Sequence, residues 1–176
     1  MDLGKQNILF FTRTMMLGGT ENVVLQLCEV FKPKVNKIVV CSCGGVNVEK
    51  LTEMGIRHYQ IPDISSKKDM FKICRTVKKI VEKEQITVIH SHHRMAAFYT
   101  EILFGSSIIK IANAHNTFFD KKLLTRFAYR NTKVIAVGKM VKKNLVDYFR
   151  IPEKQVSVIH LSLIHISEPT RQEAIS

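Results

Sequence analysis

The chain has 176 residues, 45% of them hydrophobic, and carries a net charge of +12 at neutral pH. A chain of this length can bury one good core, so we expect one soluble globular domain. Its apolar runs are far shorter than the about 20 residues that span a bilayer, and no signal peptide is visible, which favours a cytoplasmic location. The positive charge favours an anionic partner, such as a phosphorylated substrate, an acidic membrane or nucleic acid, unless it only solvates the surface.

The first predicted unit covers residues 7–31 and consists of a strand, a glycine loop and a helix. Ile8 to Phe11 is a continuous apolar run, typical of a strand buried on both faces of a parallel sheet. Leu17-Gly18-Gly19-Thr20-Glu21 interrupts the run, and apolar residues then recur at helical spacing until Pro33. Because a helix N-terminus attracts anions, we predict that Gly18, Gly19 and Thr20 bind a phosphate of the substrate.

The glycine loop does not follow a common nucleotide-binding pattern. It lacks both the GxGxxG spacing of dinucleotide folds and the GxxxxGK[ST] spacing of P-loops. Two adjacent glycines still let the backbone approach a ligand closely. The alternative is a tight strand-to-helix turn that needs glycine only for a positive φ.

The rest of the chain alternates between strand and helix patterns. Strands are predicted at 37–43, 58–62, 86–90, 108–114, 133–137 and 156–160, and helices at 47–54, 70–81, 94–104, 121–129 and 138–150. Such alternation predicts an α/β fold, a doubly wound parallel sheet with right-handed crossovers. In these sheets ligands bind beyond the carboxyl ends of the strands.

Histidines cluster where two predicted strands end. His90 lies within its strand and is predicted to be a satisfied core residue, whereas His115 follows its strand directly and is predicted to face the cleft. Ser91, His92 and Asn116 are predicted to bind substrate. Histidines in these places could bind a hydroxylated or phosphorylated substrate, act as acid or base, or ligate a metal. No carboxylate is expected to partner them, so we predict no metal site.

The cysteines are predicted to be free thiols. Cys28, Cys41, Cys43 and Cys74 lie in apolar helix or strand contexts and do not form two CxxC pairs. This pattern favours buried thiols in a reducing compartment over disulfides or zinc ligands. The Cys41-Ser42-Cys43 pattern is a weak metal signal for which plain strand residues are the favoured interpretation.

The last segment, residues 161–176, differs in kind from the rest. Residues 161–171 match the translation of a widely used transposase-type sequencing adapter. We hypothesise that residues from about Leu161 onward are an assembly artefact and that the natural protein continued further, and we exclude the segment from fold reasoning. A natural helical or irregular tail is the alternative. An uninterrupted reading frame through these codons in independent genomic clones would refute the adapter hypothesis.

The order of these motifs resembles the N-terminal domain of GT-B glycosyltransferases of family 4. The matching segments are Leu17–Glu21, Val88–His92, Ile111–Thr117 and Val134–Gly138, within a resemblance that covers residues 7–160. The resemblance implies one Rossmann-like half of a two-domain, metal-independent, retaining enzyme. That enzyme transfers a sugar from a nucleotide-sugar donor, its co-substrate, to a glycan or lipid-linked acceptor, as in polysaccharide biosynthesis, and needs no other cofactor.

The same resemblance implies roles for single residues. The glycine loop would lie against the phosphates of the donor, and His115 would line the interdomain cleft as the catalytic candidate. Gly138 stands where the family often has serine, so a hydroxyl role is not expected there. The paired glutamates of the donor half are absent, so we expect this chain to be inactive alone.

Two other classes of function compete with the glycosyltransferase. A basic nucleic-acid-binding domain is disfavoured because the charge is spread over several helices and no RRM, KH or helix-turn-helix signature appears. A non-catalytic α/β interaction module is compatible with the same fold. The basic segment 67–83 could also hold the chain at an anionic membrane face, although a solvated helix face explains it equally well.

Overall fold

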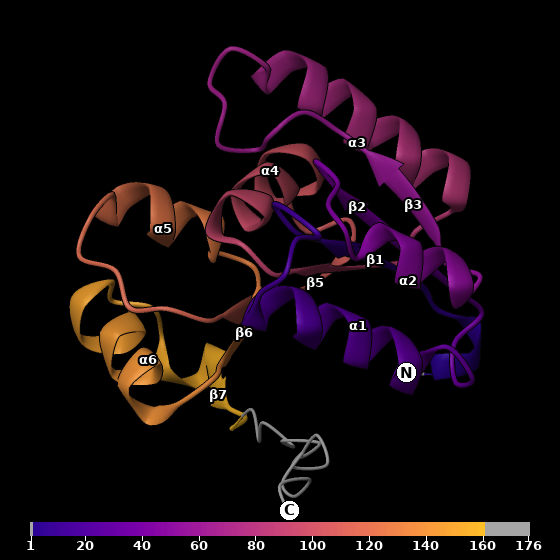
Figure 1. Cartoon of the computed structure of the whole chain (residues 1–176). Coiled ribbons are helices and arrows are strands. Elements are labelled where there is room, and N and C mark those ends of the chain that lie inside the picture. The colour runs from indigo at the N-terminus through magenta and orange to yellow at the C-terminus, as the bar shows by residue number, and fades with distance from the viewer. Residues whose placement is uncertain (1, 161–176) are drawn as a thin grey trace, which may run out of the picture.

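The computed structural model describes residues 2–160, and the segment that matches the adapter lies outside them. Seven parallel strands form one sheet in the order β3-β2-β1-β4-β5-β6-β7. The strands are β1 (Asn7–Phe11), β2 (Lys37–Ser42), β3 (Arg57–Gln60), β4 (Val88–Ser91), β5 (Ile109–Ala114), β6 (Lys133–Ala136) and β7 (Val156–Val158). The helices are α1 (Gly19–Phe31), α2 (Val48–Glu53), α3 (Met70–Glu84), α4 (Arg94–Phe104), α5 (Lys122–Ala128) and α6 (Lys139–Lys143). The predicted doubly wound α/β sheet is confirmed (Figure 1).

The central strand β1 explains how the layers form. All five of its residues are buried, as the continuous apolar run predicted. Successive side chains point to opposite faces of a sheet. Leu9 and Phe11 therefore join the core beneath α3 and α4, whereas Ile8 and Phe10 join the core beneath α1 and α2. Figure 1 shows α3 and α4 on one side of the sheet and α1 on the other.

Most elements differ from their predicted extents by a few residues, and two of these differences concern the packing. Strand β4 begins at Val88 rather than at Ile86, whose side chain instead packs into the core with α3. The helix predicted at 138–150 is α-helical only to Lys143 and continues as a π-helix, η2 (Asn144–Tyr148). The Asn144 side chain explains the anchoring of this segment, because it bonds both the N–H and the C=O of Phe118 at 3.1 and 2.9 Å. π-Helical turns are rare and are frequently found at functional sites.

The four cysteines of the described chain carry free thiols. Cys28 and Cys41 are buried, which confirms the prediction for these two, and Cys43 and Cys74 are half-buried. Burial raises the pKa of Cys28 to about 12 and also raises that of Cys41. These thiols are therefore protonated and unreactive at neutral pH.

A buried carboxylate, Glu84, ties the end of α3 to the sheet. It accepts hydrogen bonds from the Tyr59 hydroxyl at 2.5 Å, Lys37 Nζ at 3.0 Å and Arg57 at 2.9 Å, and its side chain is 5% exposed. These hydrogen bonds, led by that of Tyr59, lower the pKa of Glu84 from 4.5 to about 2. The ionised form is therefore the one that stabilises the fold.

We expect Glu84→Gln to lower the free energy of unfolding at pH 7 by about 2 kcal/mol, the scale of a hydrogen bond to a charged group. A depressed carboxyl pKa stabilises the protein above the unfolded-state value and loses this effect as the pH falls. The difference between variant and parent should therefore shrink between pH 4.5 and about 2. Urea unfolding across this range measures it, with the exposed Glu82→Gln as control. An identical pH dependence of Glu84→Gln and the parent protein would contradict the assignment.

Candidate functional site

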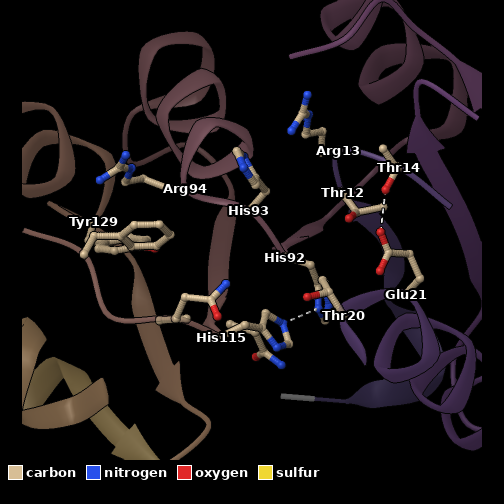
Figure 2. A pocket seen from close by; sticks show the side chains of 14 residues that line it. Thr12, Arg13, Thr14, Thr20, Glu21, His92, His93, Arg94, His115 and Tyr129 are labelled. Atoms are coloured by element: carbon tan, nitrogen blue, oxygen red, sulfur yellow. Dashed lines mark hydrogen bonds between the residues drawn. The ribbon is translucent and has the colours of Figure 1, made fainter. Parts of the chain in front are cut away.

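A cavity of about 220 Å³ opens at the carboxyl edge of the sheet, where the strand order changes direction between β1 and β4. The chain leaves β1 toward β2 on one side and β4 toward β5 on the other, so the loops after these strands part and leave a crevice. Figure 2 shows the side chains that surround it. They are Thr12, Arg13, Thr14, Thr20, Glu21, His92, His93, Arg94, Asn113, Ala114, His115, Asn116, Phe118 and Tyr129.

Three histidine rings form a row from the core to the cavity. The ring centroids of His90 and His92 are 4.5 Å apart, and those of His92 and His115 are 5.6 Å apart. Phe10 lies against the first two rings, at 5.5 and 5.8 Å. His90 Nε2 pairs with Asn113 Oδ1 at 3.0 Å, so His90 is the satisfied core histidine that the sequence predicted. His92 Nδ1 lies 3.4 Å from Nε2 of His115, the ring closest to the opening.

Burial keeps the histidines of the site neutral at physiological pH. It lowers the pKa of His90 to about 4 and that of His92 well below its usual value. Burial, together with the positive charges of Arg13 and Arg94, lowers the pKa of His93 to about 4. The pKa of His115 is also lowered by burial, while the Glu21 carboxylate acts in the opposite direction. Each neutral imidazole offers one N–H donor and one nitrogen acceptor.

The backbone of the glycine loop differs from the predicted alternative of a turn with positive φ. Gly18 has an extended backbone with φ of 179°, and the described glycines with positive φ are 44, 45, 55 and 105, so the positive-φ alternative was wrong. A Cβ on Gly18 would lie 2.5 Å from Glu21 Oε2, whereas a Cβ on Gly19 would meet open space. Gly18 therefore leaves room for the Glu21 carboxylate beside the helix N-terminus.

Glu21 is the carboxylate that the sequence reasoning did not place near the histidines. Its Oε1 accepts a hydrogen bond from the Thr14 hydroxyl, which follows β1 (Figure 2). Glu21 shares the cavity with His115 and opposes the lowering of the pKa of His115 by burial. A carboxylate in the first turn of α1 also disfavours a phosphate at the same place. The sequence could have indicated this carboxylate, because Glu21 lies two residues after Gly19 in the glycine loop.

Both arginines of the cavity already have acidic partners. Arg13 pairs with Asp63 at 2.7 Å, and this hydrogen bond lowers the pKa of Asp63 to about 2. Arg94 pairs with Asp120 at 2.8 Å and lies 4.5 Å above the Phe118 ring. Apart from the Glu21 carboxylate and these paired arginines, the cavity wall therefore presents neutral hydrogen-bonding groups, although the chain as a whole is strongly basic.

The loop that carries Arg13 and Thr14 is braced by the turn after β2. Backbone N–H groups of Met15 and Cys43 bond the carbonyls of Gly44 and Arg13, each at 2.9 Å. At Gly45, with φ of +146°, a Cβ would come within 2.4 Å of the Met15 carbonyl carbon. This is a position where glycine is required, because two backbones meet there.

The predicted site residues fall into two groups. Thr20, His92, His115 and Asn116 line the cavity. Gly18 and Gly19 lie beside it, and Ser91 is buried with its Oγ 3.5 Å from that of Thr100. The remaining lining residues were not predicted as site residues from the sequence; they include Thr12, Arg13, Thr14, Asn113 and Tyr129. Most of these residues lie within three residues of a strand end, and this position in the sequence could have indicated that they line the site.

Metal chemistry has no candidate among the described side chains. Within residues 2–160, no group of three or more His, Cys, Asp or Glu side chains is arranged to hold a metal ion. The histidine row supplies three rings, but they stack on one another rather than converge on a point. What this arrangement can do is form several hydrogen bonds to a polar, uncharged ligand.

The model of glycosyltransferase family 4 matches residues 17–162. The chain belongs to this family. The match includes the glycine loop, the histidine row and all strands from β2 onward. A comparison with curated protein sequences gives no significant match to this family 4 chain.

Solved structures share its fold at low sequence identity. A glycosyltransferase from Rickettsia africae is 15% identical, with a TM-score of 0.74. The match covers 88% of this chain and 43% of the Rickettsia chain. The lipopolysaccharide outer core galactosyltransferase WaaB is 15% identical with a TM-score of 0.71, covering 96% and 50%. HepE from Anabaena, in complex with UDP and glucose, is 14% identical with a TM-score of 0.67, covering 88% and 44%.

These likenesses show a Rossmann-like fold shared with GT-B glycosyltransferases. The family 4 chain spans about half the length of the structures that it matches. Its domain corresponds to residues 1–160 in our interpretation, and the segment 161–176 lies outside the described residues.

Proposed function

We propose that this chain is the acceptor-side half of a retaining glycosyltransferase, which transfers a hexosyl group from a nucleotide-sugar donor to a glycan or lipid-linked acceptor. Family 4 membership and the GT-B half-fold support a transferase. HepE, which shares the fold, holds UDP and glucose, which supports a nucleotide sugar as the co-substrate. No further cofactor takes part in this proposal.

The observation that carries the proposal is the number of uncharged hydrogen-bonding groups in the cavity wall. Its wall offers threonine hydroxyls, the Asn113 and Asn116 amides and imidazoles whose pKa values are lowered. Sugar hydroxyls both donate and accept hydrogen bonds, so such a wall matches them well. In this proposal His115 binds a sugar hydroxyl at the cavity opening, and His92 holds the His115 ring in place.

The proposal also gives a reason to expect no activity from this half by itself. Sugar transfer requires cationic or N–H groups at the leaving phosphate, which carries developing negative charge. Arg13 and Arg94 are engaged by Asp63 and Asp120, and Glu21 occupies the N-terminal turn of α1. The groups that stabilise the phosphate must therefore come largely from a donor-binding half.

The charge of +12 supports a place at the cytoplasmic face of a membrane, where lipid-linked acceptors are found. In this proposal the chain associates peripherally with that face. It would meet the acceptor there and release the glycosylated product into polysaccharide or glycolipid assembly.

Histidine side-chain resonances test the site directly. On titration with UDP-glucose, we expect the imidazole nitrogen signals of His92 and His115 to shift, because both rings line the cavity. His58 serves as internal control, since it lies on the edge strand β3 and its ring pairs with Ser42 at 2.8 Å. His115→Ala should weaken binding about tenfold, the effect of one lost hydrogen bond, while His58→Ala should not.

The same samples test whether the chain acts alone. We expect no release of UDP from UDP-glucose above the rate without protein. Turnover by the chain itself would overturn the proposal that it lacks the phosphate-stabilising half. Shifts confined to His58, or none at millimolar ligand, would contradict the assignment of the cavity.

A further inference from the structure

Three strongly exposed apolar side chains lie outside the histidine cavity, on the loop after β5, on α5 and on α6. Phe119, Leu123 and Met140 are 71%, 79% and 80% exposed. We call the region the Phe119 surface, and it consists of Phe119, Lys121, Lys122, Leu123, Lys139, Met140, Lys143 and Tyr148. Isolated exposed apolar residues are normal, but exposed apolar side chains grouped with charges mark interaction sites.

The Phe119 surface has a fixed shape. The rings of Phe119 and Tyr148 meet edge to face at 5.3 Å, and the Tyr148 hydroxyl donates a hydrogen bond to the Phe119 carbonyl at 2.6 Å. Tyr148 in turn packs at 4.8 Å against Phe149, which is fully buried. An apolar groove of about 360 Å³ lies between Phe119, Met140 and Tyr148. The groove is therefore preformed and anchored to the core.

Positive charge surrounds this groove. Lys121, Lys122, Lys139 and Lys143 are all exposed, and Lys122 Nζ lies 5.1 Å from the centre of the Tyr148 ring. Of the nearby acids, Asp120 is paired with Arg94, while Asp147 contributes to the groove wall. The lysines thus outnumber the acids, and their charge complements an anionic partner.

We propose that the Phe119 surface docks the chain onto an anionic lipid bilayer. Phe119, Leu123 and Met140 enter the boundary between headgroups and acyl chains, and the lysines contact lipid phosphates. This inference rests on the membrane location proposed above and names the surface of the chain that contacts the membrane. No helix within residues 2–160 is long and apolar enough to cross a bilayer, so contact of this chain through those residues is peripheral.

Two observations favour a bilayer over other anionic partners. Leu123 and Met140 have no ring on which a nucleic-acid base can stack, yet they are the most exposed members of the surface. Phe118, next to Phe119, lines the histidine cavity. Docking would therefore bring the cavity opening to the membrane, where it meets a lipid-linked acceptor.

Helix α3 offers an internal comparison. Its outer face is basic, as the sequence predicted, and Phe71 near its start is 81% exposed. Met70, beside Phe71 in sequence, is less exposed at 44%. We therefore expect α3 to be a solvated face.

The chain contains no tryptophan, so Phe119→Trp and Phe71→Trp each introduce a single fluorescent reporter. With vesicles of phosphatidylcholine and phosphatidylglycerol, we expect blue-shifted emission and quenching by brominated lipid for Phe119→Trp. Phe71→Trp should show neither change. Pure phosphatidylcholine vesicles should bind much more weakly, since the lysines then have no net anionic partner.

Charge removal provides the matched affinity test by vesicle sedimentation. Lys122→Gln with Lys143→Gln should weaken binding about fivefold per lysine. The control pair Lys78→Gln with Lys79→Gln, on the exposed face of α3, should change binding less than twofold in this mechanism. Loss of vesicle binding with an unchanged UDP-glucose titration would separate this proposal from the cavity function.

Three results would overturn it. The first is failure of the unmodified chain to bind anionic vesicles. The second is loss of binding in the α3 variants but not in the variants of the Phe119 surface. The third is binding of RNA, or self-association, through Phe119 in place of lipid binding.

Discussion

Lys110→Met is expected to lower the free energy of unfolding by about 3–5 kcal/mol, the cost of leaving a buried charge without its partner. Lys110 on β5 is 2% exposed in its side chain and pairs with the Glu101 carboxylate of α4, which is 4% exposed. Asn131 donates a further hydrogen bond to Glu101 at 2.6 Å, and Lys110 also bonds the Gly105 carbonyl. Since domains are stable by about 5–15 kcal/mol, this one change removes much of the total.

Chemical denaturation of the variants measures this effect. Replacing both partners, as Glu101→Met with Lys110→Met, should recover most of the loss, because a buried pair can be exchanged for apolar groups at small cost. The pair of half-buried Lys142 and exposed Glu153 provides the control, and Lys142→Met should cost less than about 1 kcal/mol. A loss for Lys110→Met no larger than for Lys142→Met would show that the pair is not effectively buried.

Phe10→Ala is expected to have an effect of similar size, about 3–5 kcal/mol, because it empties a fully buried site at the centre of the sheet. The change should also disturb the site, since Phe10 lies against the rings of His90 and His92. We therefore expect the imidazole signals of His92 and His115 to broaden or shift even in variants that remain folded.

Phe10→Leu separates the two consequences. It keeps most of the volume and should cost less than about 1.5 kcal/mol, while still removing the aromatic contact with the histidines. Equal losses for Phe10→Leu and Phe10→Ala, measured by denaturation, would contradict the proposed packing. Unchanged histidine signals in both variants would show that Phe10 does not hold the row in place.

Much of the fold was predictable because its signals are local. The buried run at Ile8–Phe11, the apolar stripe of α3 and the alternation of strand and helix patterns each depend on residues close in sequence. Helix α4 has its predicted bounds, and the other elements differ at their ends by a few residues. Only the π-helical turn after Lys143 required knowledge of a distant partner, the loop at Phe118.

The candidate site was predictable only in part. The rule that ligands bind beyond strand ends selected His92, His115 and Asn116, all of which line the cavity. The same rule also selected Ser91, which belongs to β4 and is buried against Thr100. A shift of one residue at the end of a strand decides whether a side chain points into the core or into the cavity. The sequence pattern does not locate the strand end to within one residue.

The sequence by itself determined the order of strands and helices, the buried strand at the centre and the edge of the sheet at which a ligand site would form. Only the tertiary structure decided the character of that site. Arg13 meets Asp63 across 50 residues, and Glu21 comes to share a cavity with His115. Burial then lowers the pKa values of the histidines. Such pairings and desolvation depend on distances in space, whereas periodicity reports only neighbours along the chain.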